Sequence, residues 1–277
     1  MRRSTLFAFL GGAIVVVALA AGRWTYFPAP SRPPGDLEYL PTGGGAMSTA
    51  AASFTRPAFA ADSSSGGVEF ARETVGAEPS SFLAVVGNWV IGLDADKRVL
   101  VVDGRKWKEG QPSVGIAEKA RALYGERYTE FLDSVRSHAY FPYAVARGTD
   151  DFKGGEIALR FKPIAGRIDQ AAGILFNLRP NGDYLTLRAN ALENNLVLWQ
   201  VVHGKRSAIE AVEGTPSLTP EWHDLKIAVN GTRVEGYLDG KLYLTHSLPE
   251  PVSGHVGIWS KADSVVYFDD FAVKPAN

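Results

Sequence analysis

The chain contains no cysteine among its 277 residues and carries almost no net charge. The absence of cysteine excludes disulfides, thiol nucleophiles and cysteine-ligated metals, so the stability of the fold must come from core burial. A formal net charge of −1 gives no electrostatic basis for binding nucleic acid. We therefore predict a protein without a nucleic-acid partner, held together by the apolar residues that make up 45% of the chain.

Several signatures of catalysis and metal binding are also missing. No Gly-x-Ser-x-Gly sequence marks a serine nucleophile, and no Walker-type loop marks a phosphate site. The five histidines show no metal-binding spacing, so we predict neither a metal site nor a cofactor. Asp94 and Asp96 leave a divalent metal such as calcium open as an alternative. A hairpin turn is favoured there, because two carboxylates supply too few oxygen ligands.

Residues 1–27 predict a signal peptide or a membrane anchor. Two arginines precede an apolar run from Leu6 to Ala21, and small residues at 18–20 fit a signal-peptidase site. Aromatic residues directly after the run are typical of a membrane interface, so an uncleaved segment that binds the membrane is an equal alternative. Either way we expect the rest of the chain to be exported, periplasmic or extracellular, or anchored to the inner membrane by residues 6–21.

Residues 28–78 predict a disordered linker, and residues 79–277 predict a folded domain. The linker is rich in proline, glycine, serine and alanine, a composition that buries little apolar surface. The domain has the pattern of an antiparallel β-protein after residue 152. Apolar and polar residues alternate over short segments, and Asn230-Gly231 and Asp239-Gly240 are typical hairpin turns. Short strands separated by turns predict a sandwich or jelly roll.

One segment of the domain has helical periodicity instead. Apolar residues recur at steps of three and four over residues 115–137, with charged residues between them. We predict one helix there, inserted between the first hairpin and the main run of strands. We expect its apolar side to pack on the sandwich and its charged side to face solvent.

Five blocks of the domain together resemble one broad family. They are Gly87-Asn88-Trp89, residues 184–195, Gly204-Lys205-Arg206, residues 222–225 with Asp239-Gly240, and residues 257–264 with Phe268-Asp269-Asp270. Over residues 80–275 the chain resembles the concanavalin A-like lectin/glucanase and laminin G-like domains. It most resembles the bacterial 3-keto-disaccharide hydrolase or family 16 glycoside hydrolase-like group. The resemblance implies an all-β fold, an antiparallel β-sandwich of the concanavalin A-like jelly-roll type.

The resemblance implies three functions, and the sequence leaves the choice among them open. The first is an exported carbohydrate-binding module of the bacterial cell envelope, whose partner is a carbohydrate or glycoconjugate. The second is a hydrolase or lyase acting on glycosides or 3-keto-sugars, and the third is a structural or adhesion module without a small ligand. The Glu-x-Asp-x-x-Glu motif, which carries the acid and nucleophile of retaining glucanases, is absent.

The candidate site consists of polar residues within the resembling blocks. The ligand-binding candidates are Tyr184, Arg188, Asn190, Asn195, Arg206 and Lys261, and the acid–base candidates of a hydrolase are Glu193, Asp263 and Lys205. Strand alternation places Tyr184, Arg188 and Asn190 on one face, which is either a recognition surface or an ordinary solvent face.

Purely structural roles are alternatives for several of these residues. Glu193 and Arg206 are equally interpreted as a structural ion pair, and Asp263 as a turn cap. Trp199, Trp222 and Trp259 are candidates for stacking on sugar rings, although core burial is favoured for each.

Overall fold

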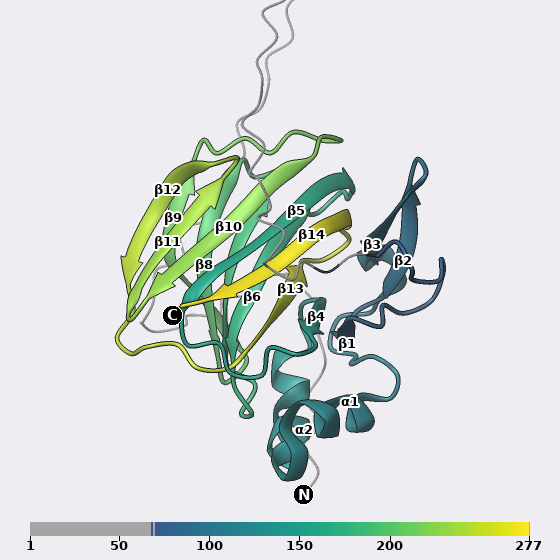
Figure 1. Ribbon diagram of the computed structural model, residues 1–277, viewed down its shortest axis with the longest axis vertical. Helices are drawn as coiled ribbons and strands as arrows, with labels where there is room; N and C mark the ends of the chain where they lie inside the picture. The colour runs from purple at the N-terminus through teal and green to yellow at the C-terminus, as the bar shows by residue number, and fades with distance from the viewer. Residues whose placement is uncertain (1–67, 69, 277) are drawn as a thin grey trace, which may run out of the picture. The chain divides into compact units, whose positions relative to one another are not determined.

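Two seven-stranded antiparallel sheets pack face to face in the computed structural model, which describes residue 68 and residues 70–276 (Figure 1). The first sheet has the order β1 (Phe82–Val86), β4 (Tyr143–Ala146), β13 (His255–Ser260), β6 (Ala171–Leu178), β7 (Tyr184–Asn190), β8 (Asn195–Val202) and β9 (Lys205–Glu213). The second has the order β12 (Lys241–Ser247), β11 (Arg233–Leu238), β10 (His223–Asn230), β5 (Gly155–Ala165), β14 (Val265–Pro275), β3 (Lys97–Asp103) and β2 (Trp89–Asp94).

The apolar positions of the alternating strands fill the space between the two sheets. In β5, Ile157, Leu159 and Phe161 are buried in this core, while the residues between them are partly exposed. β14 lies next to β5 and pairs with it over most of its length, so the C-terminal strand is at the centre of its sheet. The predicted all-β antiparallel sandwich is therefore confirmed.

The predicted helical insertion is present, but it is broken into two short helices. α1 (Ile116–Tyr124) and α2 (Tyr128–His138) are joined by the 3-10 turn η2 (Gly125–Arg127), and a further 3-10 turn, η1 (Gly104–Lys106), follows β3. Gly125 has φ 54° and ψ −127°, a backbone conformation that side chains disfavour and that cannot continue a helix. The helical segment predicted near 115–137 is therefore confirmed, and Gly125 divides it.

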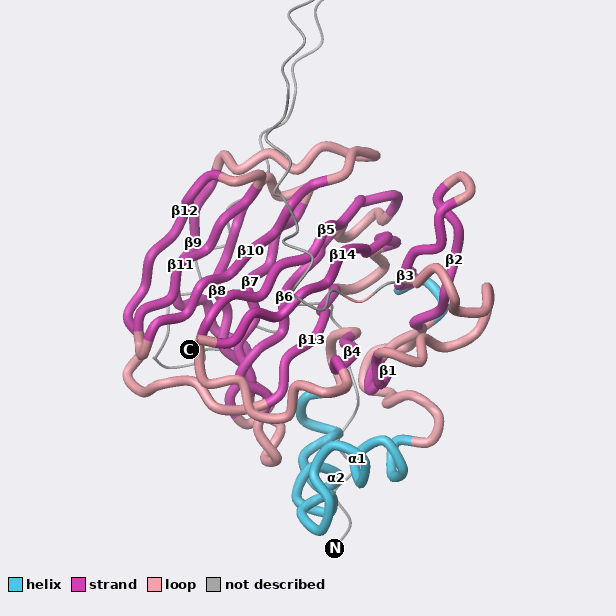
Figure 2. The backbone as a smooth tube through the Cα atoms, viewed as in Figure 1, coloured by secondary structure: helices cyan, strands magenta, loops and turns pink. Residues whose placement is uncertain are grey.

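The two helices cover one end of the outer face of the first sheet (Figures 1 and 2). Ala120, Phe131 and Val135 of the helices pack against outward-facing residues such as Tyr143 and Trp259. The result is a second apolar cluster outside the sandwich, separate from the core between the sheets. The first sheet is therefore covered on both sides over part of its area.

The outward-facing side of β7 is buried along its length, and of its outward-facing residues Tyr184 belongs to the cluster beneath the helices. Tyr184, Thr186, Arg188 and Asn190 point away from the core between the sheets, as the alternation predicted, yet their exposed fractions are only 2, 0, 1 and 0%. The alternative that this face is an ordinary solvent face is therefore wrong. β7 instead carries buried polar side chains, and buried polar groups need hydrogen-bond partners.

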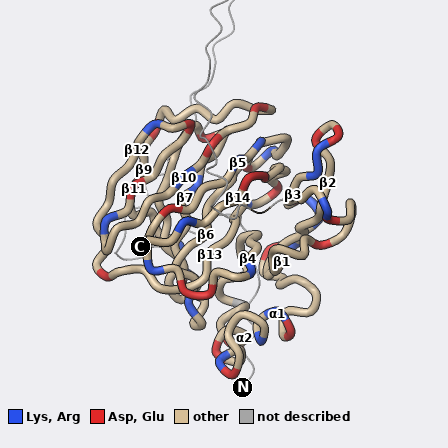
Figure 3. The backbone as a smooth tube through the Cα atoms, viewed as in Figure 1, with Lys and Arg blue, Asp and Glu red and all other residues tan. Residues whose placement is uncertain are grey.

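The apolar run of residues 6–21 lies outside the described residues, so the predicted N-terminal helix is not among the elements of this structure. Within the described part, no helix is long and apolar enough to cross a bilayer. Contacts to the sandwich begin ahead of residue 79: the Val68 amide donates to the Phe271 carbonyl at 2.8 Å, and Phe70 is buried. Acidic and basic residues are interspersed over the strands, in keeping with the small net charge (Figure 3).

The docking of α2 predicts a pH-dependent stability. His138 is buried, with its Nδ1 2.7 Å from the Tyr143 hydroxyl, and burial lowers the pKa of His138 to about 4. An unfolded histidine titrates near 6.5, so on acidification the unfolded state gains its proton first. This contribution is complete above about pH 6.5, and we expect about 3 kcal/mol of it to be lost as the pH falls from there to about 4.

The measurement is urea denaturation of the wild type and of His138→Gln across this pH window. The glutamine keeps a hydrogen-bonding group near Tyr143 but does not titrate, so its free energy of unfolding should fall less than that of the wild type. Equal losses for the two proteins would contradict the assignment.

Candidate functional site

A polar hollow of about 260 Å³ lies on the outer face of the first sheet, over β7, β8 and β9. We call it the β7–β9 cleft. Its charged, polar and aromatic lining residues are Arg188, Glu193, Asn195, Trp199, Arg206, Glu213 and Lys261. The strand register explains why they meet, since Arg188 is opposite Val197, and Val197 is opposite Ala211 on the next strand. Side chains on one face of neighbouring strands are direct neighbours.

Arg188 is the most deeply placed charge of the cleft. Its side chain is 1% exposed, and its Nη1 donates to Glu193 Oε2 at 2.6 Å and to Asn195 Oδ1 at 2.8 Å. Burial of Glu193 opposes its ionisation, but the charges of Arg188 and Lys261 outweigh this and hold the pKa of Glu193 below its usual range. Glu193 is therefore an ionised acceptor at neutral pH.

The alternative of an ion pair between Glu193 and Arg206 is wrong. Glu193 contacts Arg188 and, at 3.4 Å, Lys261. Glu193 precedes the first residue of β8, whereas Arg206 is opposite Val201 near the last residue of β8. The two residues therefore belong to opposite ends of that strand, and Arg188 is the nearer cation.

A series of hydrogen bonds to two carboxylates, Asp263 and Asp169, holds the cleft residue Lys261 in place. Asp263 accepts the backbone N–H groups of Arg167, Ile168 and Asp169 at 2.7, 2.9 and 3.1 Å, which outweigh its burial and lower the pKa of Asp263. The buried Asp169 then accepts from Asn190 Nδ2 at 2.7 Å and from Lys261 Nζ at 2.9 Å. Asp263 thus binds the distant segment 167–169, where the sequence had favoured a cap of its own turn, and it positions Lys261 through Asp169.

The structure brings together five of the nine predicted site residues: Arg188, Glu193, Asn195, Arg206 and Lys261. Tyr184 and Asn190 are buried and do not line the cleft; Tyr184 belongs to the cluster beneath the helices, where its hydroxyl accepts from Trp259 Nε1 at 3.2 Å. Lys205 is exposed and does not line the cleft. Trp259 is buried, as favoured, whereas Trp199 lines the cleft.

Sequence reasoning missed Glu213 and Asp169. A register shift between Leu198 and Trp199 leaves an extra residue in β9, so Arg206 and Glu213 line the same cleft although seven positions separate them. Simple alternation puts residues an odd number of positions apart on opposite faces. The alternation of apolar and polar residues in the sequence does not reveal a bulge of this kind.

Three of the ten buried side-chain polar atoms that have no partner among the described residues belong to residues lining this cleft. Arg188 Nε, Trp199 Nε1 and Arg206 Nη1 are buried, and none has a hydrogen-bond partner among the described residues. Three unused donors in one polar hollow are unusual, because buried donors are nearly always paired. They indicate that the cleft is built to receive hydrogen-bond acceptors from outside the chain.

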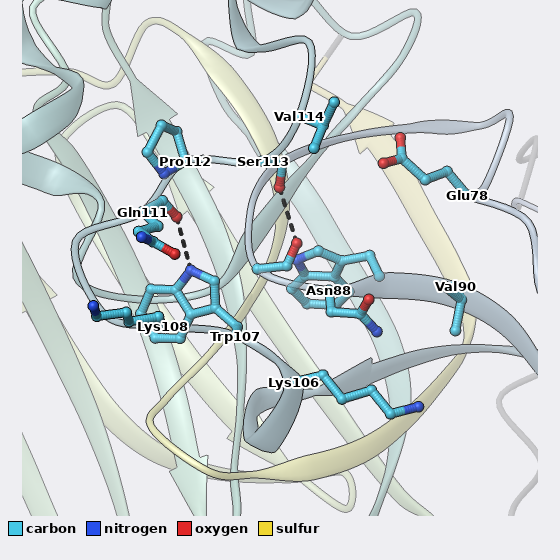
Figure 4. A pocket seen from close by; sticks show the side chains of 12 residues that line it. Glu78, Asn88, Val90, Lys106, Trp107, Lys108, Gln111, Pro112, Ser113 and Val114 are labelled. Carbon is cyan, nitrogen blue, oxygen red and sulfur yellow. Dashed lines mark hydrogen bonds between the residues drawn. The ribbon is translucent and has the colours of Figure 1, made fainter.

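A second hollow, of about 230 Å³, lies next to Trp107 and Asn88 (Figure 4). Two of its polar side chains, those of Trp107 and Ser113, are already used within the chain. Trp107 Nε1 donates to the Gln111 carbonyl at 2.8 Å, and Ser113 Oγ donates to the Gly87 carbonyl at 2.9 Å. None of its lining residues carries a buried unpartnered side-chain atom. The β7–β9 cleft is therefore the stronger candidate for ligand binding.

The described residues contain no group of three or more histidines, aspartates or glutamates placed to hold a metal ion. Asp94, one of the two carboxylates considered for calcium, is paired with Lys162 at 2.9 Å and accepts from Trp222 Nε1 at 2.8 Å. Trp222 is therefore a member of the second sheet's outer surface. The turn after Asp94 joins β2 to β3, as the favoured hairpin interpretation predicted.

No protein-family model matches the chain, and no curated protein matches it. Similar solved structures include the carbohydrate-binding module CBM66 from Bacillus subtilis, which is 13% identical with a TM-score of 0.48 over 69% of this chain and 93% of that one. A Bacillus licheniformis β-glucanase is 10% identical with a TM-score of 0.44 over 77% and 100%. The Caenorhabditis elegans galectin LEC-6 is 17% identical with a TM-score of 0.37 over 47% and 88%.

The burial of Arg188 predicts a large effect on stability. Arg188→Ala leaves Glu193 and Asn195 without their shared donor and opens a cavity under the cleft. Removal of one partner of a buried charge pair costs about 3 kcal/mol or more, and we expect a loss of that order in urea denaturation.

Lys205→Ala is the matched control, because it removes an exposed cation from the neighbouring strand and should change stability by less than about 0.5 kcal/mol. If Arg188→Ala were as stable as Lys205→Ala, Arg188 would not be the structural tie that its contacts describe.

Proposed function

We propose that this chain is an exported carbohydrate-binding module and that the β7–β9 cleft binds the saccharide. The observation that carries the proposal is the set of unpartnered donors on Arg188, Trp199 and Arg206 in one polar hollow. Export is supported by the two arginines and the apolar run at the N-terminus.

The chemistry of the cleft suits sugar hydroxyls. Each hydroxyl both donates and accepts, and the cleft offers donors on Arg188 and Arg206 beside acceptors on Glu193 and Glu213. Asn195 supports this arrangement, since it accepts from Arg188 at 2.8 Å and donates to Glu213 at 3.4 Å. Side chains locked by such bonds hold their geometry before a ligand arrives, which lowers the entropic cost of binding.

The size and origin of the cleft are in keeping with this function. Its volume of about 260 Å³ is near the lower end of small-molecule pockets, roughly 300 Å³ and above, so it suits a short saccharide end. The lining residues predicted from the sequence all belong to blocks that resemble concanavalin A-like domains, including residues 184–195 and 257–264. That resemblance supports a saccharide as the ligand class.

A hydrolase acting on glycosides or 3-keto-sugars stays a prediction. Of its three proposed acid–base residues, Glu193 alone lines the cleft. Asp263 is occupied by three backbone amides, and Lys205 is exposed outside the cleft. The lowered pKa of Glu193 suits an acceptor better than a general acid, which must hold its proton near neutral pH.

Trp199→Ala should reduce saccharide affinity at least tenfold. Trp199 lines the cleft, its Nε1 is an unused donor, and its ring lies 4.2 Å from the Arg206 guanidinium carbon. Trp199 would both donate a hydrogen bond to the saccharide and hold the Arg206 guanidinium in place, so its loss should cost about 1.4 kcal/mol or more of binding free energy. The measurement is a glycan panel followed by calorimetric titration of each ligand that binds.

Trp222→Ala is the matched control, because that tryptophan contacts Asp94 and the cations of the second sheet. It should leave the affinity unchanged. Absence of binding to every saccharide at millimolar concentration would overturn the proposed function, and equal losses in the two variants would place the site outside the cleft.

A further inference from the structure

Arg206 differs from the other cations of the cleft in having no acidic partner. Among the described residues, its guanidinium makes no hydrogen bond and no ion pair, although Nη1 is buried. Its contacts are with aromatic rings: the guanidinium carbon lies 4.2 Å from the ring centre of Trp199 and 4.8 Å from that of Phe141. A guanidinium carries five N–H donors, and no described residue accepts a hydrogen bond from those of Arg206.

The acids nearest to the cleft are already used by other groups. Glu193 pairs with Arg188 at 2.6 Å, and Asp169 pairs with Lys261 at 2.9 Å. Glu213 accepts from Asn195 at 3.4 Å and forms no ion pair with Arg206. Arg188 and Lys261 therefore each form an ion pair within the described residues, and Arg206 forms none.

This imbalance has an electrostatic cost in the free protein. Burial, together with the nearby positive charge of Arg188, lowers the pKa of Arg206. An arginine nevertheless stays protonated in proteins, so the charge is carried in an unfavourable environment. A bound anion offsets both effects, because it supplies the missing counter-charge and accepts the free hydrogen bonds.

The ring contacts of Arg206 leave its hydrogen-bonding capacity unused. Cation–π contacts with Trp199 and Phe141 do not consume N–H donors, which lie in the plane of the guanidinium. That planar edge matches two oxygens of one anionic group. The rings also restrict the side chain, so little entropy is lost when such a group binds.

We propose that the saccharide bound in the β7–β9 cleft is acidic, and that Arg206 is the specificity-determining residue that binds its anionic group. This inference rests on the proposed function of the same cleft. A uronic acid carboxylate and a sulfate ester both present paired anionic oxygens to the guanidinium. The experiment below distinguishes these two sources of the negative charge. Neutral sugars are left to the hydroxyl-binding part of the cleft, around Glu193 and Asn195.

The test uses matched ligands on the 277-residue chain in calorimetric titration. One pair is an oligogalacturonate and its carboxyl-reduced neutral counterpart, and the other is a sulfated oligosaccharide and its desulfated form. We expect at least tenfold tighter binding of the acidic member of one pair, as for a charge-assisted hydrogen bond. The preferred pair identifies carboxylate or sulfate as the source, and the preference should weaken as salt is raised.

Three variants separate Arg206 from general charge effects. Arg206→Gln should abolish the preference for the acidic ligand, so that the acidic and the neutral member of a pair bind with the same, reduced affinity. Arg206→Lys, which keeps the charge but loses the planar fork, should retain part of the preference. Lys205→Gln changes the net charge equally, from a residue outside the cleft, and should behave as the wild type.

The outcomes distinguish this inference from the proposed function. Equal binding of acidic and neutral ligands, or a preference that survives in Arg206→Gln, overturns the acidic specificity and leaves saccharide binding standing. Failure of every ligand overturns both. Melting temperatures check the folding of each variant, and Arg206→Gln should be at least as stable as the wild type, because it removes an unbalanced charge.

Discussion

The carboxylate of Asp263 is the constraint on which the cleft depends. By accepting three successive backbone amides, it holds the segment before β6 in one conformation, with Asp169 at its end. Asp169 then fixes Asn190 and Lys261, and Lys261 reaches Glu193, the partner of Arg188. A surface that would otherwise consist of long mobile side chains is thereby held in a defined arrangement, through charge-assisted bonds that reach from the β13–β14 loop to β7.

The helical insertion and the cleft are two uses of the same sheet face. At one end, α1 and α2 exclude water with an apolar cluster around Phe131 and Trp259. At the other end none of the helices in the described part of the chain covers the sheet, and polar groups line a hollow instead. Phe141 stands between the two regions: it follows α2, packs on Trp259 and contacts the Arg206 guanidinium. The helical insertion and the segment after it thus both stabilise this sheet face and position Phe141 against Arg206 of the candidate site.

Much of the fold was predictable because it follows from local periodicity. The alternation through Ile157, Leu159 and Phe161 and the Asn230-Gly231 turn specify strands and a hairpin without reference to distant residues. The site was only partly predictable. Alternation put Arg188 on the right face, but neither its burial nor its pairing with Glu193 and Asn195 around the β7–β8 turn follows from alternation. The bulge in β9 and the break at Gly125 each depend on a single residue. A periodic pattern is read over a whole segment, so it does not reveal either of them.

The burial of β7 on both faces also bears on how such a protein can change during evolution. The outward-facing positions 184, 186, 188 and 190 are as inaccessible as the core leucines between them, so substitutions there are penalised as core substitutions are. The partly exposed Lys261 and Arg206 have no such restriction. New ligand preferences are therefore expected to arise at β9 and the β13–β14 loop, around a central strand that stays the same while the rim of the cleft diverges.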